Sequence, residues 1–414
     1  MTLSDLVQHI VSASVPGFIP HPHTIALDSI DIETYCRRRS HSSNGTPDVD
    51  HQHLPAGPRS RTTGSKPKAG FPRTGPDGRL IHTADPDVRE GWRSAKEGTT
   101  SIFLGWDLHL CVDVPHLGQE PTPSLVRACT LAPAGSSKTA AGHQTLTHIP
   151  TTQVVLADRG YSYRRDWGPT IHSLGMTSAF DLHTTQHGVR PGPRPGIVIV
   201  DGGYFSDAVP ESLRCLDHYR SGMTDVEKLA LASQYDARAR YAFTPMGSPS
   251  ANGRLRLRGP AITGRVRCRN HPASMRLART ADHPTTACQD TCGCGRTATI
   301  SLDEWSRLWQ WPLYGTTAWL VSYNRRVAVE STNAELKSNR FRLARGSIKV
   351  WGLARSSVLI GFVLGALNMA IVGDWYGRDW TDLVDATQAP SKLVRRASVK
   401  VAKHRQIHSG APPG

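Results

Sequence analysis

Short apolar runs crowd the first half of this chain, and a long polar stretch separates them from one longer apolar run near the end. Short apolar runs bounded by turn residues are typical of buried strands. Strands that precede an interruption, with helices after it, predict an α/β fold divided by an insertion rather than two independent domains. The short runs are residues 24–30, 101–114, 124–132, 154–161 and 177–184, and the long run is residues 358–373.

Charge and composition narrow the class of protein. The 414 residues carry a formal net charge of +15, which favours a polyanionic partner, most simply nucleic acid, although a solvated basic surface gives the same sum. A hydrophobic content of 38% excludes disorder throughout. The sequence contains no Gly-x4-Gly-Lys-Ser/Thr motif, so it has no P-loop.

The two ends of the chain carry different signals. The N-terminus lacks a basic segment before its apolar residues and contains Asp5, so we expect a helix within residues 1–22 and no signal peptide. The run at 358–373 is shorter than the ~20 residues that cross a membrane, and Asn368 interrupts it. We therefore interpret it as a buried helix of a cytoplasmic protein.

Two segments are too polar to build a core. Residues 37–91 are rich in Ser, Gly, Pro, His and Arg, which predicts a long, partly disordered loop. Residues 391–410 contain Lys and Arg but no Asp or Glu, which predicts a solvated basic arm.

Three acidic residues have settings that suit a metal site. Asp28 and Asp158 each come at the end of an apolar run, and Glu330 lies in a predicted helix. Carboxylate oxygens are the ligands that Mg²⁺ prefers. Two such ions can hold the attacking and leaving oxygens of a phosphodiester displacement.

Other acidic residues occupy similar positions. An aspartate at a strand end is more often a turn residue or a helix cap than a ligand. Asp201 ends an apolar run but precedes two glycines, so we interpret it as a turn residue. Asp107 and Asp113 lie within the run at 101–114 and are further rivals.

The surroundings of Glu330 distinguish it from the other acids. Tyr323, Arg326, Glu330 and Lys337 have the spacing Tyr-x2-Arg-x3-Glu-x6-Lys, which at about 100° per residue predicts one shared helix face. A carboxylate between two cations suits a metal ligand beside phosphate-binding groups. The alternative is an ordinary surface helix whose Arg326–Glu330 pair contributes only a few tenths of a kcal/mol.

This spacing resembles the signature around the last catalytic acid of DDE transposases from bacterial insertion sequences. IALDSIDIETYCRRRS resembles the segment around the first catalytic aspartate of that family, and VVLADRGYS resembles the segment around the second. GWDLHLCVDV resembles the strand hairpin between the two, and ADPDVREGW the loop before it. The pieces occur in the family's order and span residues 24–376.

The resemblance implies an RNase H-like mixed sheet flanked by helices and interrupted by an irregular, partly β insertion. It implies that Asp28, Asp158 and Glu330 are the catalytic ligands of Mg²⁺ or Mn²⁺, and that Tyr323, Arg326 and Lys337 position DNA. The expected units are an N-terminal helix and linker (1–22), the two parts of the core (23–185 and 316–376), the insertion (186–315) and a basic tail (377–414).

The function that the resemblance implies is metal-dependent DNA cleavage and strand transfer. The expected partner is double-stranded DNA, both transposon ends and target, bound by a homodimer at the bacterial nucleoid and not at a membrane. Family members usually carry a DNA-binding region before the first aspartate, whereas 27 residues precede Asp28 here, so we expect a truncated or decayed copy. A nuclease with the same core and a non-catalytic DNA-binding remnant are the alternatives.

A cysteine cluster within the insertion predicts a second metal site. Its members are Cys268, His271, Cys288, Cys292 and Cys294. Thiolate and imidazole ligands suit tetrahedral Zn²⁺, which would stabilise a region with little core of its own. The alternative is a set of free, partly buried thiols in a reducing compartment.

Basic residues follow two of the three acids. Arg164 and Arg165 follow Asp158, and four more basic residues follow Glu330 along the chain, at Arg340, Arg342, Arg345 and Lys349. We expect them to line a groove that binds DNA phosphates without reading base sequence.

Overall fold

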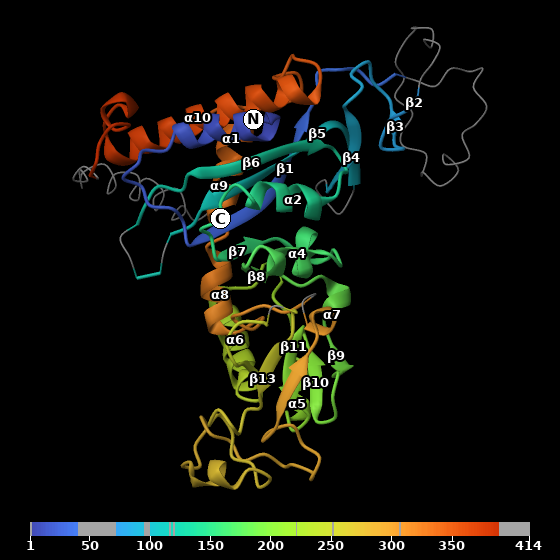
Figure 1. Cartoon of the computed structure of the whole chain (residues 1–414), viewed down its shortest axis with the longest axis vertical. Coiled ribbons are helices and arrows are strands. Elements are labelled where there is room, and N and C mark those ends of the chain that lie inside the picture. The colour runs from blue at the N-terminus through green and yellow to red at the C-terminus, as the bar shows by residue number, and fades with distance from the viewer. Residues whose placement is uncertain are drawn as a thin grey trace, which may run out of the picture.

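The computed structural model describes residues 2–39, 72–94, 100–115, 117–118, 121–220, 222–250, 252–305 and 308–388. Most of the predicted long loop, residues 40–71, and the predicted basic arm lie outside the described residues. Figure 1 shows an elongated molecule with the larger sheet at one end and the segment after β8 extending to the other.

A six-stranded mixed sheet forms the centre of the core, and it confirms the predicted α/β class. Its strands are β1 (Thr24–Glu33), β4 (Arg89–Ser94), β5 (Thr100–Asp113), β6 (Val126–Pro133), β7 (Val154–Ala157) and β8 (Thr177–Phe180). Their order is β4-β5-β1-β7-β8, with β6 also paired to β5. β5 is antiparallel to β1, β4 and β6, whereas β7 is parallel to both β1 and β8.

The first strand is longer than its apolar run suggested. It was expected to end near Asp28, but it continues to Glu33 because residues 28–33 pair with β5. Its pairing with β7 ends at Leu27, opposite Ala157. Asp28 therefore lies inside β1 yet at the end of the parallel part of the sheet.

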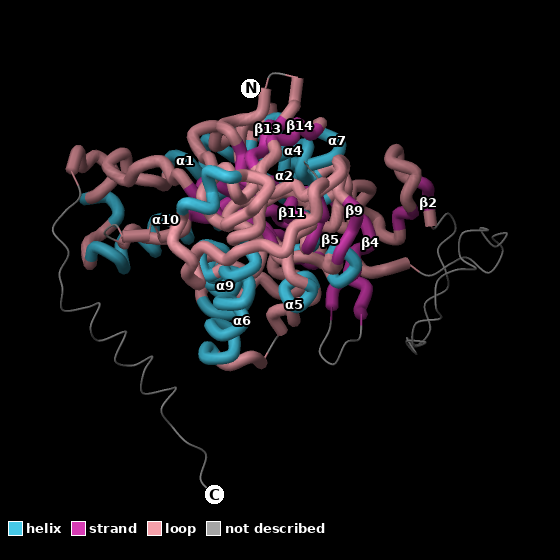
Figure 2. The backbone as a smooth tube through the Cα atoms, turned by 90° about the horizontal axis from the view of Figure 1, so that it is seen from below, coloured by secondary structure: helices cyan, strands magenta, loops and turns pink. Residues whose placement is uncertain are grey.

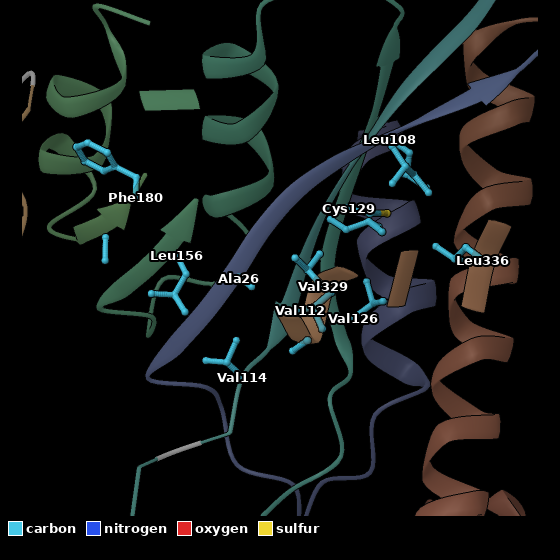
Figure 3. Packing of buried hydrophobic residues seen from close by; sticks show 14 of the residues in the cluster. Ala26, Leu108, Val112, Val114, Val126, Cys129, Leu156, Phe180, Val329 and Leu336 are labelled. Carbon is cyan, nitrogen blue, oxygen red and sulfur yellow. The ribbon is translucent and has the colours of Figure 1, made fainter. Parts of the chain in front are cut away.

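Helices cover both faces of this sheet. α1 (Leu3–Ala13) and α10 (Leu353–Tyr376) lie together along one face, as Figure 1 shows, and α2 (Lys138–Leu146) and α4 (Trp167–Ser173) lie on the other. Two hydrophobic clusters contain alternate residues of β1, with Ala26 in one cluster and Leu27 in the other. In Figure 3, Val329 lies beside Val112 and Val126 of the sheet, and Leu336 belongs to the same buried cluster, so the segment that carries Glu330 is anchored by apolar packing.

Helix α10 is longer than the apolar run that predicted it. By length and composition it is the one helix among the described residues that could span a membrane, and half of its apolar window is buried. Asn368 on this helix is fully buried and donates to Val126 O and Ser14 Oγ, each at 2.9 Å. Val126 N donates back to Asn368 Oδ1 at 2.9 Å. These bonds and its packing on α1 are typical of a helix in a protein core, although Phe362 is exposed.

After β8 the chain leaves the sheet, and it returns through α8 (Thr317–Asn324), α9 (Val327–Ala334) and the π-helical turn η5 (Glu335–Asn339). Two small sheets lie between, β9 to β11 and β12 to β14, and Figure 2 shows that loops make up much of the backbone around them. Their strands are β9 (Val189–Pro191), β10 (Ile197–Val200), β11 (Gly203–Ser206), β12 (Thr244–Pro245), β13 (Leu255–Arg258) and β14 (Thr297–Ile300). The helices of this segment are η3 (Thr184–Gln186), α5 (Glu211–Arg214), α6 (Asp225–Ala239), η4 (Pro272–Arg276) and α7 (Leu302–Trp305).

The remaining elements are short. β2 (Arg73–Thr74) and β3 (Leu80–Ile81) form a small hairpin in the segment that was predicted to be a loop. α3 (Arg159–Ser162) follows β7 directly, and η6 (Trp380–Asp382) follows α10.

Candidate active site

Asp28 and Asp158 lie at the same level on neighbouring parallel strands. Leu27 and Ala157 are register partners, so the next residue on each chain, Asp28 and Asp158, comes at the same height. Side chains at the same register position of adjacent strands point to the same face of a sheet. The parallel pairing of β1 with β7 therefore brings two residues together that are far apart in the sequence.

Asp158 does not cap the helix that it precedes. It occupies the N-cap position of α3, but its side chain makes no capping hydrogen bond. Its buried Oδ1 has no hydrogen-bond partner among the described residues. A buried carboxylate oxygen without a partner is costly unless a cation or a ligand satisfies it. The helix-cap interpretation therefore does not account for Asp158.

The surroundings of Asp28 favour the protonated form of its carboxyl group over the ionised form. Burial raises the pKa of Asp28, and the negative charge of Asp158 raises it further, while Arg326 opposes the rise. Asp28 Oδ2 accepts from Asn333 Nδ2 at 3.1 Å and lies 3.5 Å from Arg326 Nη1. A buried carboxylate beside a second carboxylate is a setting in which a divalent cation is favourable.

The segment that carries Tyr323, Arg326 and Glu330 is not one regular helix, contrary to expectation. Between α8 and α9 the backbone bonds shorten to three-residue spacing, for example from Arg326 N to Tyr323 O at 2.9 Å. In a 3₁₀ turn, side chains three apart eclipse each other. Tyr323 and Arg326 are therefore aligned better than the regular helix predicted, with the guanidinium carbon 5.8 Å from the ring centroid.

Arg326 connects the first and third predicted acids. Its guanidinium lies near Asp28 on one side and forms an ion pair with Glu330 on the other. Burial would lower the pKa of Arg326, but Tyr323 and the surrounding carboxylates raise it overall. Glu330 is half exposed, and its link to Asp28 runs through this guanidinium.

Lys337 contacts β1, the strand that carries Asp28. It falls in the π-helical turn η5, where the backbone bond from Arg340 N to Glu335 O spans five residues and shifts the following side chains around the axis. Lys337 forms an ion pair with Asp31 of β1. Arg326 and Lys337 therefore both contact the strand that carries Asp28, through Asp28 and Asp31 respectively.

Sequence reasoning missed three polar residues near this site. Asn333, one helical turn beyond Glu330, contacts Asp28, and its buried Oδ1 has no partner among the described residues. Asp181 follows Phe180, the register partner of Ala157, so it lies level with Asp158 on the next strand. Burial raises the pKa of Asp181, and Arg159 opposes that rise. The run TSAFD has the same apolar-then-aspartate form as VVLAD, which was the available signal.

Lys138 is the third missed residue. A Cβ built on Gly160 would lie 3.1 Å from Lys138 Nζ and 3.0 Å from Asp158 Oδ1, so both groups approach this glycine. The positive charge of Lys138 also lowers the pKa of Asp28, against the larger effects of burial and Asp158. Lys138 lies in the first turn of α2, and its sequence setting gave no signal.

The rival aspartates have structural partners. Asp113 forms a buried ion pair with Arg127, with Nε 2.8 Å from Oδ2. Asp107 Oδ2 accepts from Gly135 N at 2.8 Å. Asp201 lies in the hairpin turn between β10 and β11 with a φ of 46°, as its sequence setting predicted, and it forms an ion pair with Arg238 at 2.8 Å.

The predicted basic residues divide into two groups. Arg340 forms ion pairs with Glu335 and Asp374, so its charge is already balanced. The second group consists of exposed side chains, at Arg164, Arg165, Arg342, Arg345 and Lys349.

The cysteines of the second predicted metal site come together, but the histidine does not join them. The Sγ atoms of Cys268, Cys288, Cys292 and Cys294 all lie within 4.8 Å of one another. His271 is outside this group and instead precedes η4.

A second cluster, which the sequence did not suggest, contains His187, Asp201 and His218. Burial would raise the pKa of Asp201, but the hydrogen bond from His187 and the charge of Arg238 lower it to about 2. Arg238 thus already supplies the cation of this cluster.

Comparison of the chain with protein-family models, with curated proteins and with solved structures found no match.

Proposed function

We propose that this chain is a DDE transposase, which cleaves DNA strands with divalent metal ions and joins the freed 3′-hydroxyl to target DNA. The observation that carries the proposal is the pairing of Asp28 with Asp158 at one level of neighbouring parallel strands, with Arg326 linking Asp28 to Glu330. These three acids are the ones that the resemblance to the family assigns.

The strand arrangement supports an RNase H-like core. On one side of β1, β5 is antiparallel to β1 and β6 is antiparallel to β5. On the other side, β7 is parallel to β1 and β8 is parallel to β7. The ends of parallel strands are where acidic residues can gather at one edge. The third acid arrives on α9 after the long excursion from the sheet, in the order that the family resemblance implies.

The acidic residues have the donor chemistry for Mg²⁺ or Mn²⁺. Asp28, Asp158 and Glu330 would hold the ion, and Asp181 adds a fourth carboxylate at the same level. The unpartnered Oδ1 atoms of Asp158 and Asn333 suit a ligand that supplies positive charge or a bound water. When bound, such ions activate the attacking hydroxyl or water and stabilise the charge on the leaving oxygen.

The side chains around the acids have distinct roles in this proposal. The positive charge of Arg326 offsets the charge of the carboxylates. When DNA enters, the guanidinium N–H groups can bind a phosphate oxygen in place of Glu330. Tyr323 holds the guanidinium in place by packing beneath it. Asn333 orients Asp28 by donating to Oδ2.

A nicking assay on supercoiled DNA with Mg²⁺ or Mn²⁺ tests the proposal. The wild-type chain should nick the plasmid, and Asp158→Asn should lower the rate about a hundredfold or more, because the metal stabilises the transition state by several kcal/mol. Asp225→Asn, which changes an exposed carboxylate of α6, is the matched control and should nick normally.

The products separate this function from its alternatives. Joining of a 3′-hydroxyl oligonucleotide to plasmid supports strand transfer, whereas nicking alone points to a nuclease. Salt-sensitive DNA binding that ignores metal, with no cleavage, points to a DNA-binding remnant. Unchanged nicking by Asp158→Asn would refute the assigned triad.

A further inference from the structure

Four buried cysteines meet in the excursion between β13 and β14, residues 259–296. Cys268 comes from its first part, and Cys288, Cys292 and Cys294 come from its last part. All four side chains are buried, with exposed fractions of 0 to 6%. The isolated bridge between Arg267 and Thr285 brings the two parts alongside each other. The cluster therefore joins segments that share little regular structure.

The spacing of the sulfurs matches a tetrahedral metal site. With Zn–S bonds of about 2.3 Å, tetrahedral geometry separates the sulfurs by about 3.8 Å. Cys268 Sγ lies 3.5 Å from Cys288 Sγ and 3.6 Å from Cys292 Sγ, and Cys288 Sγ lies 3.6 Å from Cys294 Sγ. Four sulfurs that already surround one point need little rearrangement to bind an ion.

Disulfide pairing explains this arrangement less well. A disulfide brings two sulfurs to about 2.05 Å and leaves other sulfurs farther away. Here Cys268 and Cys288 each have two sulfur neighbours at similar distances, and the four cysteines are not bonded in pairs. The sulfurs are therefore spaced evenly around one point, as a central metal ion requires.

Polar groups next to the sulfurs are placed to support thiolate ligands. Asn270 Nδ2 donates to Cys292 Sγ at 3.2 Å, the Ser206 hydroxyl lies 3.0 Å from Cys294 Sγ, and the Thr286 hydroxyl lies 2.8 Å from Cys288 Sγ. Hydrogen bonds of this kind orient metal ligands and balance their charge.

The backbone around Cys292 and Cys294 is packed too tightly for a larger residue between them. A Cβ on Gly293 would lie 2.2 Å from Gly196 O, so the loop rests directly on the turn before β10. Gly293 N also donates to Asp207 Oδ1 at 3.2 Å. Ordering the cysteine loop therefore orders its contact with the neighbouring small sheet.

We propose that Cys268, Cys288, Cys292 and Cys294 form a structural zinc site that holds the 259–296 excursion in its fold. All four positions are filled by protein ligands, which is typical of structural rather than catalytic zinc. The cysteines are a third of their small apolar cluster, so its folding depends on what they bind. This site is independent of the chemistry proposed at Asp28 and Asp158.

Metal analysis of the full chain tests the proposal. Chain purified under reducing conditions, without added zinc, should contain one zinc ion per molecule by mass spectrometry of the metals. Replacement by Co²⁺ should give the intense visible bands of tetrahedral cobalt thiolate. Removal of the ion with a chelator should lower the unfolding temperature, and added zinc should restore it.

Variants define the ligand set. Cys268→Ser and Cys292→Ser should each bring the zinc content from one ion per chain to near zero. Cys215→Ser changes an exposed cysteine outside the cluster, and His271→Ala changes the excluded histidine, so both should retain the full zinc content.

Three outcomes would overturn the inference. A wild-type chain that binds neither zinc nor cobalt would reject the site, even if the serine variants failed to fold. A mass lower by four hydrogens would show two disulfides instead. Loss of zinc in His271→Ala equal to that in Cys292→Ser would replace the four-cysteine set with one that includes the histidine.

Discussion

Asp28 and Asp158 show how a candidate active site costs stability at the level of single residues. The two carboxylates lie at one level of the sheet, and the charge of Asp158 adds to burial in raising the pKa of Asp28. Arg326 and Asn333 compensate only in part, because Asp158 Oδ1 and Asn333 Oδ1 stay without partners among the described residues. Such unsatisfied groups are typical of sites that bind a ligand.

The raised pKa of Asp28 predicts that Asp28→Asn stabilises the fold at neutral pH. The folded chain binds the Asp28 proton more tightly than the unfolded chain does, so the ionised group destabilises the fold above the folded pKa. As the pH falls toward the ordinary value of 3.8, both states become protonated and the penalty disappears. The variant should therefore unfold at a higher temperature at pH 7, and this gain should shrink as the pH is lowered.

Thermal unfolding of both proteins across this pH range measures the effect. Asp225→Asn is the control, since that side chain is 94% exposed. A lower unfolding temperature for Asp28→Asn at pH 7 would mean that the ion pair with Arg326 outweighs burial and the charge of Asp158.

At the level of elements, the break between α8 and α9 decides which side chains meet. Three-residue bonds at Arg325 and Arg326 tighten the chain, and the π-helical turn beyond Ala334 loosens it again. The first change aligns Tyr323 with Arg326, and Lys337 in the π-helical turn pairs with Asp31 of β1. Irregular turns of both kinds are frequent at functional sites.

Helix α10 depends on one buried amide, which predicts that Asn368→Ala is strongly destabilising. The amide satisfies both backbone groups of Val126, and its loss would remove these two hydrogen bonds from buried groups, while the Ser14 hydroxyl keeps its bond to Val11 O. Each unsatisfied group costs about 1–3 kcal/mol, so we expect a loss of about 2–4 kcal/mol in the free energy of unfolding.

Denaturant unfolding measures this loss. Asn339→Ala, at an exposed position of η5, should change stability by less than about 0.5 kcal/mol. Equal stability of Asn368→Ala and the wild type would show that α10 does not depend on its docking to β6.

At the scale of the whole molecule, charge is spread over two distant ends. Arg342 and Arg345 follow the segment that carries Glu330, whereas Arg276 and Arg279 lie in the excursion at the opposite end in Figure 1. All four side chains are exposed, so both ends present cations to a polyanion.

We predict that Arg342→Ala with Arg345→Ala weakens DNA binding, because these residues follow the segment that carries Glu330 in the candidate active site. Each lost phosphate contact lowers the slope of log affinity against log salt by about 0.9, so two contacts lower it by about 1.8. Binding isotherms at several salt concentrations measure this slope. Arg276→Ala with Arg279→Ala removes the same charge from the other end and should leave the slope unchanged, and equal effects of the two pairs would indicate binding by net charge.

The sequence predicted the strands well because alternating and continuous apolar runs mark the side chains that a sheet buries. The strand pair in GWDLHLCVDV and SLVRACTLA, the strand in TSAFD and the turn at Asp201 all appear in the structure. The length of β1 was wrong because residues 28–33 are held by pairing with β5, which is a tertiary interaction. The length of α10 was wrong because polar residues at its ends are also helical.

By itself, the sequence determined the α/β class, the order of the elements and the acidic and cysteine residues worth testing, because these follow from local pattern and composition. Only the tertiary structure decided which of them meet. Strand register placed Asp28 level with Asp158 and added Asp181, and packing against β1 brought Arg326 to Asp28 and Lys337 to Asp31. Loop packing gathered four cysteines without His271. Contacts between residues distant in sequence depend on register, helix phase and packing, which no single segment encodes.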